Sequence, residues 1–238
     1  MKPEELSALE YFIAGVPPRA IFEMDIEGLK KLVESTTNYQ ESQIRGTMIS
    51  EVCLIGLAAY FEAYCKNQFA AIINICPQTL ETFATKRDNL TIKLKDILKI
   101  SGMIDYRLGS LLAEQYDFGS ARTINSLFFD LLGVTLFSRS ETEKYAEFLE
   151  DRNLLVHHGG IFTLKYREKA TPKSLRDRVY FDSLVIHKDD FLRWATFIHQ
   201  LVNKFTVTTH KALQEFVSSN GVNLEEETSK AINFLLME

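Results

Sequence analysis

One stretch of the sequence, EFLEDRNLLVHHGGIF at positions 147–162, carries side chains that suit chemistry on a phosphate ester. Arg152 stays charged at physiological pH and offers a planar fork that matches phosphate oxygens. His157 and its neighbour His158 carry imidazoles, and histidine is a residue type that commonly acts as a base or an acid. Together these residue types would supply proton transfer and charge stabilisation at one place.

The element that must position these groups is a helix over residues 140–158. Ser140 begins a capping box with Glu143, and Gly159 and Gly160 allow the left-handed conformation that ends a helix. Five apolar residues recur at three- and four-residue spacing and predict a buried stripe, namely Tyr145, Phe148, Leu149, Leu155 and Val156. Arg152 falls inside this stripe, whereas Asn153 and His157 share a face beside it.

An arginine in an apolar stripe needs a partner, a cavity or a route along its stem to solvent. Glu62 is the only charge in the run VCLIGLAAYFEAYC, which predicts a helix that is buried on most sides. A buried carboxylate also needs a partner, so Glu62 and Arg152 are candidates for one ion pair. The alternative is an exposed pair of Glu62 with Lys66 at i, i+4, and the sequence leaves both open. Alternatively, the aliphatic stem of Arg152 could lie along the apolar stripe and bring its guanidinium to solvent. His157 could likewise be only a cation that the last turn of a helix favours.

Elsewhere helical patterns dominate, so the expected fold class is mostly α with one small β-like excursion. Proline and glycine residues separate the predicted helices. The expected helices cover residues 3–14, 25–37, 42–75, 79–87, 90–100, 105–116, 122–132, 140–158, 188–218 and 224–237. Residues 161–166 and 179–187 contain β-branched and aromatic side chains and predict a hairpin-like arm. We expect N-terminal helices at 1–41, a core domain at 42–218 that includes the arm at 161–187, and a C-terminal helix at 219–238.

Composition is that of an ordinary globular protein, with 46% apolar and 25% charged residues and a net charge of −5. The charge gives no global attraction to nucleic acid, although a local basic patch would still bind it. Cys53, Cys65 and Cys76 form no CxxC pair and are expected to be buried, reduced thiols. The N-terminus lacks a signal-peptide core, and the longest apolar run, Val52 to Cys65, is short for a membrane span and is interrupted by Glu62. The expected location is cytoplasmic, without a membrane.

A basic segment directly follows the two glycines. Between positions 161 and 180 there are six basic and two acidic residues, a local balance of +4; the basic ones are Lys165, Arg167, Lys169, Lys173, Arg176 and Arg178. Such a segment can hold phosphates electrostatically with a strong dependence on salt. An ordinary solvated loop has the same composition, so both interpretations stay open.

The order Arg152-Asn153-x-x-x-His157 resembles the R-x(4–6)-H motif of HEPN domains, and RNLLVHHGG resembles the form found in RiboL-PSP-type and related prokaryotic HEPN ribonucleases. The run LIGLAAYFEAYCKNQF resembles an earlier core helix of those proteins, in which an acidic residue follows an aromatic one, here Glu62 after Phe61. The resemblance extends from about residue 42 to about residue 218. It differs at Gly159, where one variant of the motif has a tyrosine that nucleotidyltransferase antitoxins modify, so that form of control is not expected.

The resemblance implies a helical bundle, a symmetric homodimer and metal-independent endoribonuclease activity at a composite site where two motif helices meet. It assigns Arg152 and His157 as the catalytic pair and Asn153 and Glu62 as supporting residues. His158 is a further candidate, because the sequence does not tell which histidine faces the site. The implied substrate is RNA, with the basic segment as its binding arm, and neither a metal nor a cofactor is expected. The implied role is that of a toxin or an anti-phage defence effector, with an antitoxin or a defence-system protein as a partner.

Two alternatives accompany this hypothesis. The first is a non-catalytic HEPN module that binds RNA, a nucleotide or a protein partner. The second is a helical interaction protein in which Arg152 and Glu62 only stabilise the core. No P-loop, GxGxxG motif or nucleophile elbow favours another class of enzyme, and His187, His199 and His210 lack metal-ligand spacing.

Overall fold

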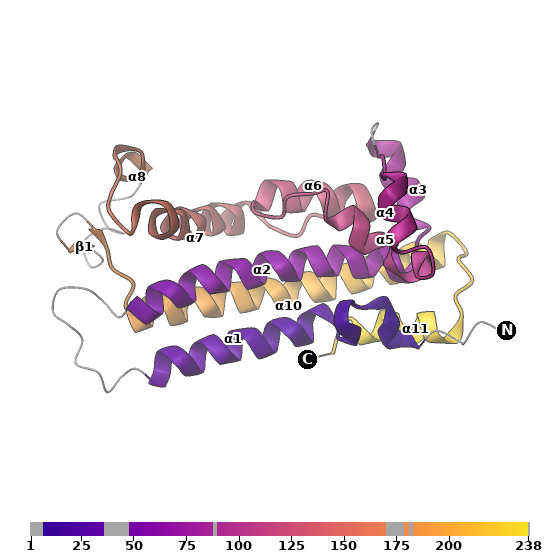
Figure 1. The fold of residues 1–238 in the computed structure, drawn as a ribbon, viewed down its shortest axis with the longest axis horizontal. Coiled ribbons are helices and arrows are strands. Elements are labelled where there is room, and N and C mark those ends of the chain that lie inside the picture. The colour runs from indigo at the N-terminus through magenta and orange to yellow at the C-terminus, as the bar shows by residue number, and fades with distance from the viewer. Residues whose placement is uncertain (1–6, 36–47, 88–89, 170–178, 181–182, 238) are drawn as a thin grey trace. The chain divides into compact units, whose positions relative to one another are not determined.

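The computed structural model describes residues 7–35, 48–87, 90–169, 179–180 and 183–237. Helices dominate this part of the chain (Figure 1), which confirms the mostly α fold. The helical elements, in chain order, are η1 (Ala8–Tyr11), η2 (Ile13–Gly15), α1 (Pro18–Ser35), α2 (Met48–Ile75), α3 (Thr79–Lys86), α4 (Leu94–Lys99), α5 (Ile104–Ala113), α6 (Ala121–Leu132), α7 (Arg139–His158), α8 (Leu164–Lys169), α10 (Lys188–Ser219) and α11 (Glu226–Phe234). The strands are β1 (Val179–Tyr180) and β2 (Ser183–Leu184), which pair antiparallel.

Most predicted helices are present, and their ends follow from local chemistry. Helix α2 stops at Ile75, before Cys76-Pro77, because a residue that precedes proline is disfavoured in the helical region. Helix α1 begins at Pro18, seven residues earlier than expected, since proline is favoured in the first turn of a helix. The expected helix at 3–14 is wrong over its described part, which forms the short 3-10 turns η1 and η2.

The arm at 161–187 differs from the prediction. Residues 164–169 form helix α8 instead of an extended strand. The hairpin lies entirely within the second segment, where Val179 pairs with Leu184 and Tyr180 with Ser183. Ile161 contributes a single bridge to Ser183, and this bridge is the part of the first segment that pairs as expected.

The chain divides into two compact units that are interleaved in sequence. The first comprises residues 1–23, 62–138 and 201–238, and the second comprises residues 24–61 and 139–200. Helices α1, α2 and α10 each contribute one part to each unit. The predicted division at positions 41 and 218 remains a prediction.

An aromatic cluster forms the core of the first unit. Phe69 of α2 makes edge-to-face contacts with Phe83 of α3 and Phe128 of α6, with ring centroids 5.6 and 5.8 Å apart. Such contacts stabilise aromatic pairs beyond the area that they bury. The buried Phe118 adds a further ring 5.7 Å from Phe69. This core orders the second half of α2.

Helix α2 carries buried amides that form hydrogen bonds within the first unit, although Oε1 of Gln68 has no partner among the described residues. Gln68 donates to Thr209 of α10 at 2.9 Å. Asn74 donates to the carbonyl of Tyr11 at 3.0 Å and accepts from the N–H of Gly109 at 2.8 Å. By length and composition α2 meets the requirement for a membrane span, which Glu62 was expected to exclude. Its buried, hydrogen-bonded amides are nevertheless those of a core helix.

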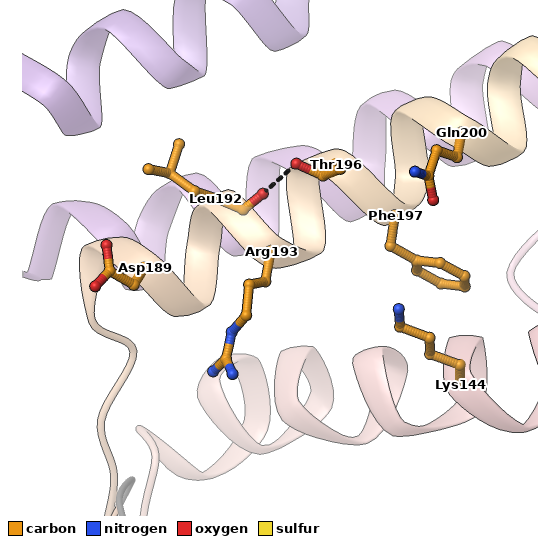
Figure 2. A pocket seen from close by; sticks show the side chains of 7 residues that line it. All are labelled: Lys144, Asp189, Leu192, Arg193, Thr196, Phe197 and Gln200. Carbon is orange, nitrogen blue, oxygen red and sulfur yellow. Dashed lines mark hydrogen bonds between the residues drawn. The ribbon is translucent and has the colours of Figure 1, made fainter.

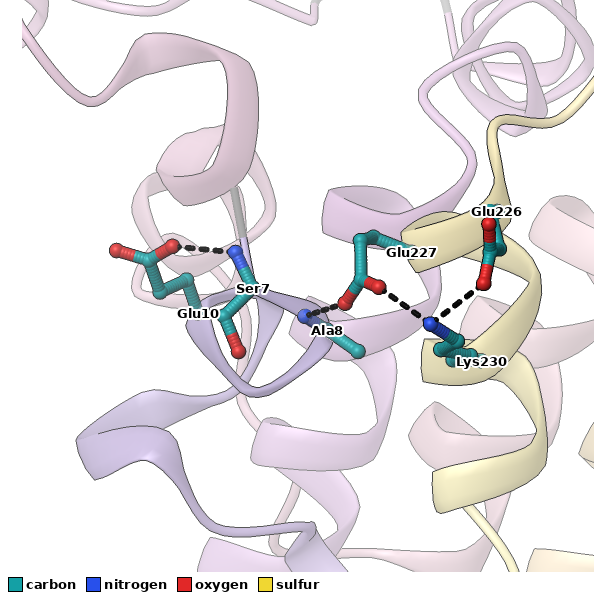
Figure 3. Close-up of polar contacts among 6 residues, drawn as sticks. All are labelled: Ser7, Ala8, Glu10, Glu226, Glu227 and Lys230. Atoms are coloured by element: carbon teal, nitrogen blue, oxygen red, sulfur yellow. Dashed lines mark hydrogen bonds and ion pairs between the residues drawn. The ribbon is translucent and has the colours of Figure 1, made fainter. Parts of the chain in front are cut away.

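The two ends of the first unit's chain are joined by polar contacts (Figure 3). The N–H of Ala8 donates to a carboxylate oxygen of Glu227 in α11 at 2.9 Å. Lys230 lies 2.7 Å from carboxylate oxygens of both Glu226 and Glu227. Deeper in the same contact, Tyr11 and Thr228 share a buried hydrogen bond of 3.0 Å.

The second unit is built around α7. Tyr145 lies edge-on to Phe61 at the end of the unit's part of α2, with ring centroids 5.3 Å apart. Phe148, one turn later, contacts Trp194 of α10 at 5.3 Å. These contacts hold α7 against both α2 and α10, so that its C-terminal end presents Asn153 and His157 outside the core.

Candidate functional site

The C-terminal end of α7 is shaped by the two glycines. Gly159 and Gly160 have φ values of 56° and 81°, in the left-handed region that glycine adopts without strain. The N–H of Gly160 donates to the carbonyl of Leu154 at 3.1 Å, which satisfies one of the helix's last carbonyls. The carbonyl of Gly160 accepts from the N–H of Leu184 at 2.8 Å, so the turn also ties strand β2 to the helix end.

A pocket of about 250 Å³ opens at this helix end. Four predicted site residues line it, namely Asn153, His157, His158 and Lys165. The imidazole rings of His157 and His158 are exposed, and their centroids lie 6.5 Å apart. The structure therefore brings both histidines, and a lysine from the next helix, to one pocket.

Four further residues of the pocket were not predicted: Glu150, Leu154, Thr163 and Tyr166. Glu150 could have been found, because it precedes Asn153 and His157 at spacings of three and seven residues and so shares their face. Thr163 and Tyr166 were missed because their segment was expected to be extended rather than helical.

A buried hydrogen bond fixes helix α8 against α7. The hydroxyl of Tyr166 donates to a carboxylate oxygen of Asp151 at 2.8 Å, and Asp151 is only 4% exposed. Thr163 caps the helix by accepting from the N–H of Tyr166 at 3.1 Å. The ring of Phe162 stacks on that of Tyr166 at 5.2 Å. These contacts hold α8 in the position from which Lys165 reaches the pocket.

Arg152 lies beside the pocket and is not part of its lining. Its Nη1 donates to Oδ1 of Asn153 at 2.8 Å, while its Nε is buried without a hydrogen-bond partner among the described residues. Arg152 is half-buried, and the buried charge of α7 is its neighbour Asp151. The stripe is also shifted, because Leu154 is buried whereas Val156 is 44% exposed.

Glu62 belongs to the first unit and Arg152 to the second, so the ion pair between them stays a prediction. The alternative is wrong, because no ion pair joins Glu62 to Lys66, two residues that the structure describes. Burial raises the pKa of the Cys65 thiol well above its ordinary value, and the nearby charge of Glu62 raises it further. Cys53, Cys65 and Cys76 are all buried free thiols, as expected.

Most of the predicted RNA-binding arm lies outside the described residues. Arg167 and Lys169 lie in α8, but their side chains are outside the described part of the structure. Lys173, Arg176 and Arg178 are themselves outside the described residues. Within the described ranges, no three His, Cys, Asp or Glu side chains are grouped so that they could hold a metal ion.

This arrangement has the groups for acid–base chemistry on a phosphate ester. Two imidazoles can each transfer a proton, and the ammonium of Lys165 can balance negative charge in the same pocket. Comparison with protein-family models, with curated proteins and with solved structures finds no match for this chain. The resemblance to HEPN domains therefore stays a prediction.

Proposed function

We propose that this protein is a metal-independent endoribonuclease of the HEPN type, which acts as a homodimer and serves as a toxin or an anti-phage defence effector. The observation that supports this proposal most is the pocket that His157 and His158 share with Asn153 and Lys165. The order of Arg152, Asn153 and His157 along α7 supports it as well, through the resemblance to the family motif.

The proposed reaction uses the nucleophile that RNA carries. One histidine takes the proton of the 2′-OH, whose oxygen attacks the adjacent phosphorus. The bond from phosphorus to the 5′-oxygen then breaks, and the other histidine protonates that oxygen as it leaves. The products are a 2′,3′-cyclic phosphate and a 5′-hydroxyl. Lys165 and an arginine stabilise the negative charge of the phosphorane, and DNA is inert because it lacks the 2′-OH.

The dimer has a specific role in this proposal. Arg152 of one protomer does not line that protomer's histidine pocket. In a two-fold dimer the same residue of the second protomer reaches the pocket instead, so each site combines one protomer's histidines with the other protomer's arginine. Each site is then incomplete in a monomer, which would make cleavage depend on dimer formation.

The first experiment measures RNA cleavage in buffer that contains EDTA. His157→Ala and Arg152→Ala should each lower the cleavage rate at least about 100-fold, the usual contribution of a positioned acid–base or charge-stabilising group. His158→Ala shows whether the second histidine has an equal share. His187→Ala is the matched control, because this exposed histidine does not line the pocket. Wild-type protein that binds RNA but leaves varied RNAs intact would favour the non-catalytic module instead.

A mixing experiment tests the composite site. Arg152→Ala and His157→Ala proteins, each inactive alone, should recover about a quarter of wild-type activity when equal amounts exchange subunits, since half of the dimers are then mixed and each has one complete site. No recovery, despite confirmed subunit exchange, would show that the arginine and the histidine of one site do not come from different protomers.

A further inference from the structure

A second, larger pocket lies between α7 and α10, within the second unit (Figure 2). Its volume is about 440 Å³, within the range of about 300–1,000 Å³ that is usual for ligand sites. Lys144 projects into it from α7, and the other lining side chains come from the first part of α10. Two cations, Lys144 and Arg193, thus face one space from two helices, and neither belongs to the histidine pocket.

Both cations are held in place by neighbouring side chains. The ammonium of Lys144 lies 4.3 Å from the ring centroid of Phe197, a cation–π contact. The guanidinium of Arg193 pairs with Asp190, which also accepts from the backbone N–H of His187 at 3.1 Å. The carboxylate of Asp190 is only 7% exposed, whereas Arg193 is 74% exposed, so the arginine keeps donors free for a ligand. Cations that are already positioned lose less conformational entropy when they bind an anion.

The rest of the lining limits which anion fits. The walls are the apolar side chains of Leu192 and Phe197, and the amide of Gln200 can donate or accept hydrogen bonds. Asp189, at the first turn of α10, opposes anion binding by charge repulsion. A site with two cations, one carboxylate and apolar walls suits the singly charged phosphodiester of a nucleic acid strand, with a base or sugar against the apolar surface.

The same helix connects the two pockets. Lys144 precedes His157 by thirteen residues on α7, which corresponds to about 20 Å along the helix axis. A strand that places one phosphate between the histidines would therefore reach Lys144 and Arg193 with phosphates several nucleotides away. A single strand can place a phosphate on the cations and a base against the apolar walls, whereas a duplex keeps its bases paired and stacked.

We propose that the pocket between α7 and α10 is a phosphodiester-binding subsite for single-stranded RNA, in which Lys144 and Arg193 contact the backbone. This inference rests on the proposed function, since it takes RNA as the substrate and adds the requirement for an unpaired strand longer than a dinucleotide. It predicts that Asp189 weakens binding, so its neutralisation has an effect of opposite sign to the loss of either cation.

The test measures fluorescence anisotropy with a labelled RNA of roughly twelve nucleotides, 2′-O-methylated throughout so that attack by a 2′-OH is impossible. Lys144→Gln and Arg193→Gln should each weaken binding roughly 3- to 10-fold and reduce the slope of log affinity against log salt by about 0.7. Asp189→Asn should strengthen binding. Thermal melts confirm that each variant is folded.

Lys211→Gln is the matched control. Lys211 is 76% exposed on α10 and faces Glu215 at i, i+4, as Arg193 faces Asp190 at i, i+3. Equal loss of affinity in this control, or wild-type affinity in the double variant Lys144→Gln/Arg193→Gln, would overturn the subsite. Displacement of the RNA by polyglutamate at the same charge concentration would also overturn it, in favour of an acidic peptide ligand. A hairpin duplex that binds as tightly as the single strand would show that the subsite does not require an unpaired strand.

The two proposals fail separately. If wild-type protein never cleaves RNA but the methylated strand depends on Lys144 and Arg193, the subsite stands and the nuclease does not. If cleavage depends on His157 while both cation variants bind the strand as wild type does, the nuclease stands and the subsite does not.

Discussion

Tyr166→Phe removes the hydroxyl that donates the buried hydrogen bond from α8 to α7, and its effect on stability can be estimated. The lost bond is 2.8 Å long and ends on a carboxylate, Asp151, that is 4% exposed. Hydrogen bonds to charged groups contribute about 1.5–3 kcal/mol, and a buried acceptor that loses a donor does not regain it from water. We therefore expect the free energy of unfolding to fall by about 1.5–3 kcal/mol.

Urea denaturation followed by circular dichroism measures this change, and a thermal melt should show a decrease of roughly 3–10 °C for a chain of this size. Tyr60→Phe is the control, because Tyr60 is 37% exposed and should change stability by less than about 0.5 kcal/mol. A loss below about 0.5 kcal/mol in Tyr166→Phe as well would refute the view that this bond fixes α8.

A double-mutant cycle separates the bond from other effects of the substitution. In the Asp151→Ala background, Tyr166→Phe should cost at least about 1 kcal/mol less than in wild type, because the acceptor is already gone. The same substitution should lower RNA cleavage more than its effect on stability explains, since α8 carries Lys165 into the histidine pocket. Additive stability effects in the cycle would show that the two side chains act independently.

Three further predictions concern the first unit. Gly109→Ala should destabilise the protein by about 1–3 kcal/mol or more in urea denaturation, because the added Cβ would lie 2.2 Å from the carbonyl oxygen of Ala70. Gly102→Ala, whose Cβ would have no atom within 4 Å, should be nearly neutral. Burial lowers the pKa of His210 below its ordinary value of 6.5, so the unfolded state takes up a proton first as the pH decreases. The stability of the protein should therefore fall as the pH decreases through that value. In His210→Gln, the difference between the urea midpoints at about pH 7.5 and about pH 5.5 should be smaller than in wild type. Burial raises the pKa of the Cys65 thiol, so it should not react with a thiol reagent until the protein is unfolded, and reaction in the native state would contradict its placement in the core.

The long helices could be predicted because strong local signals define them. Helix α2 combines an apolar run with a proline that ends it, and α10 begins with acidic residues that suit a helix N-terminus. The N-terminal elements were harder, because the short turns of η1 and η2 depend on distant contacts. Ala8 is hydrogen-bonded to Glu227, more than two hundred residues later, and no local pattern encodes such a partner.

Helix α8 shows how a tertiary contact can override local preference. Ile161, Phe162 and Tyr166 are residue types that favour strands, and they predicted an extended segment. In the structure Thr163 caps a helix instead, and that helix places the hydroxyl of Tyr166 on Asp151. The cap could have been noticed in the sequence, but the buried acceptor could not, since no local pattern marks Asp151 as the partner of Tyr166.

The buried stripe of α7 is shifted by about one residue from the stripe that the sequence predicted. Consecutive residues of a helix are about 100° apart. A stripe that was predicted one residue too late therefore included Arg152, whereas the residue that is buried is Asp151. This is why Asp151 is buried and satisfied by Tyr166, while Arg152 is half-buried and donates to Asn153. The arginine is therefore not needed to complete this unit's core, which leaves it available for the role that the dimer proposal assigns to it.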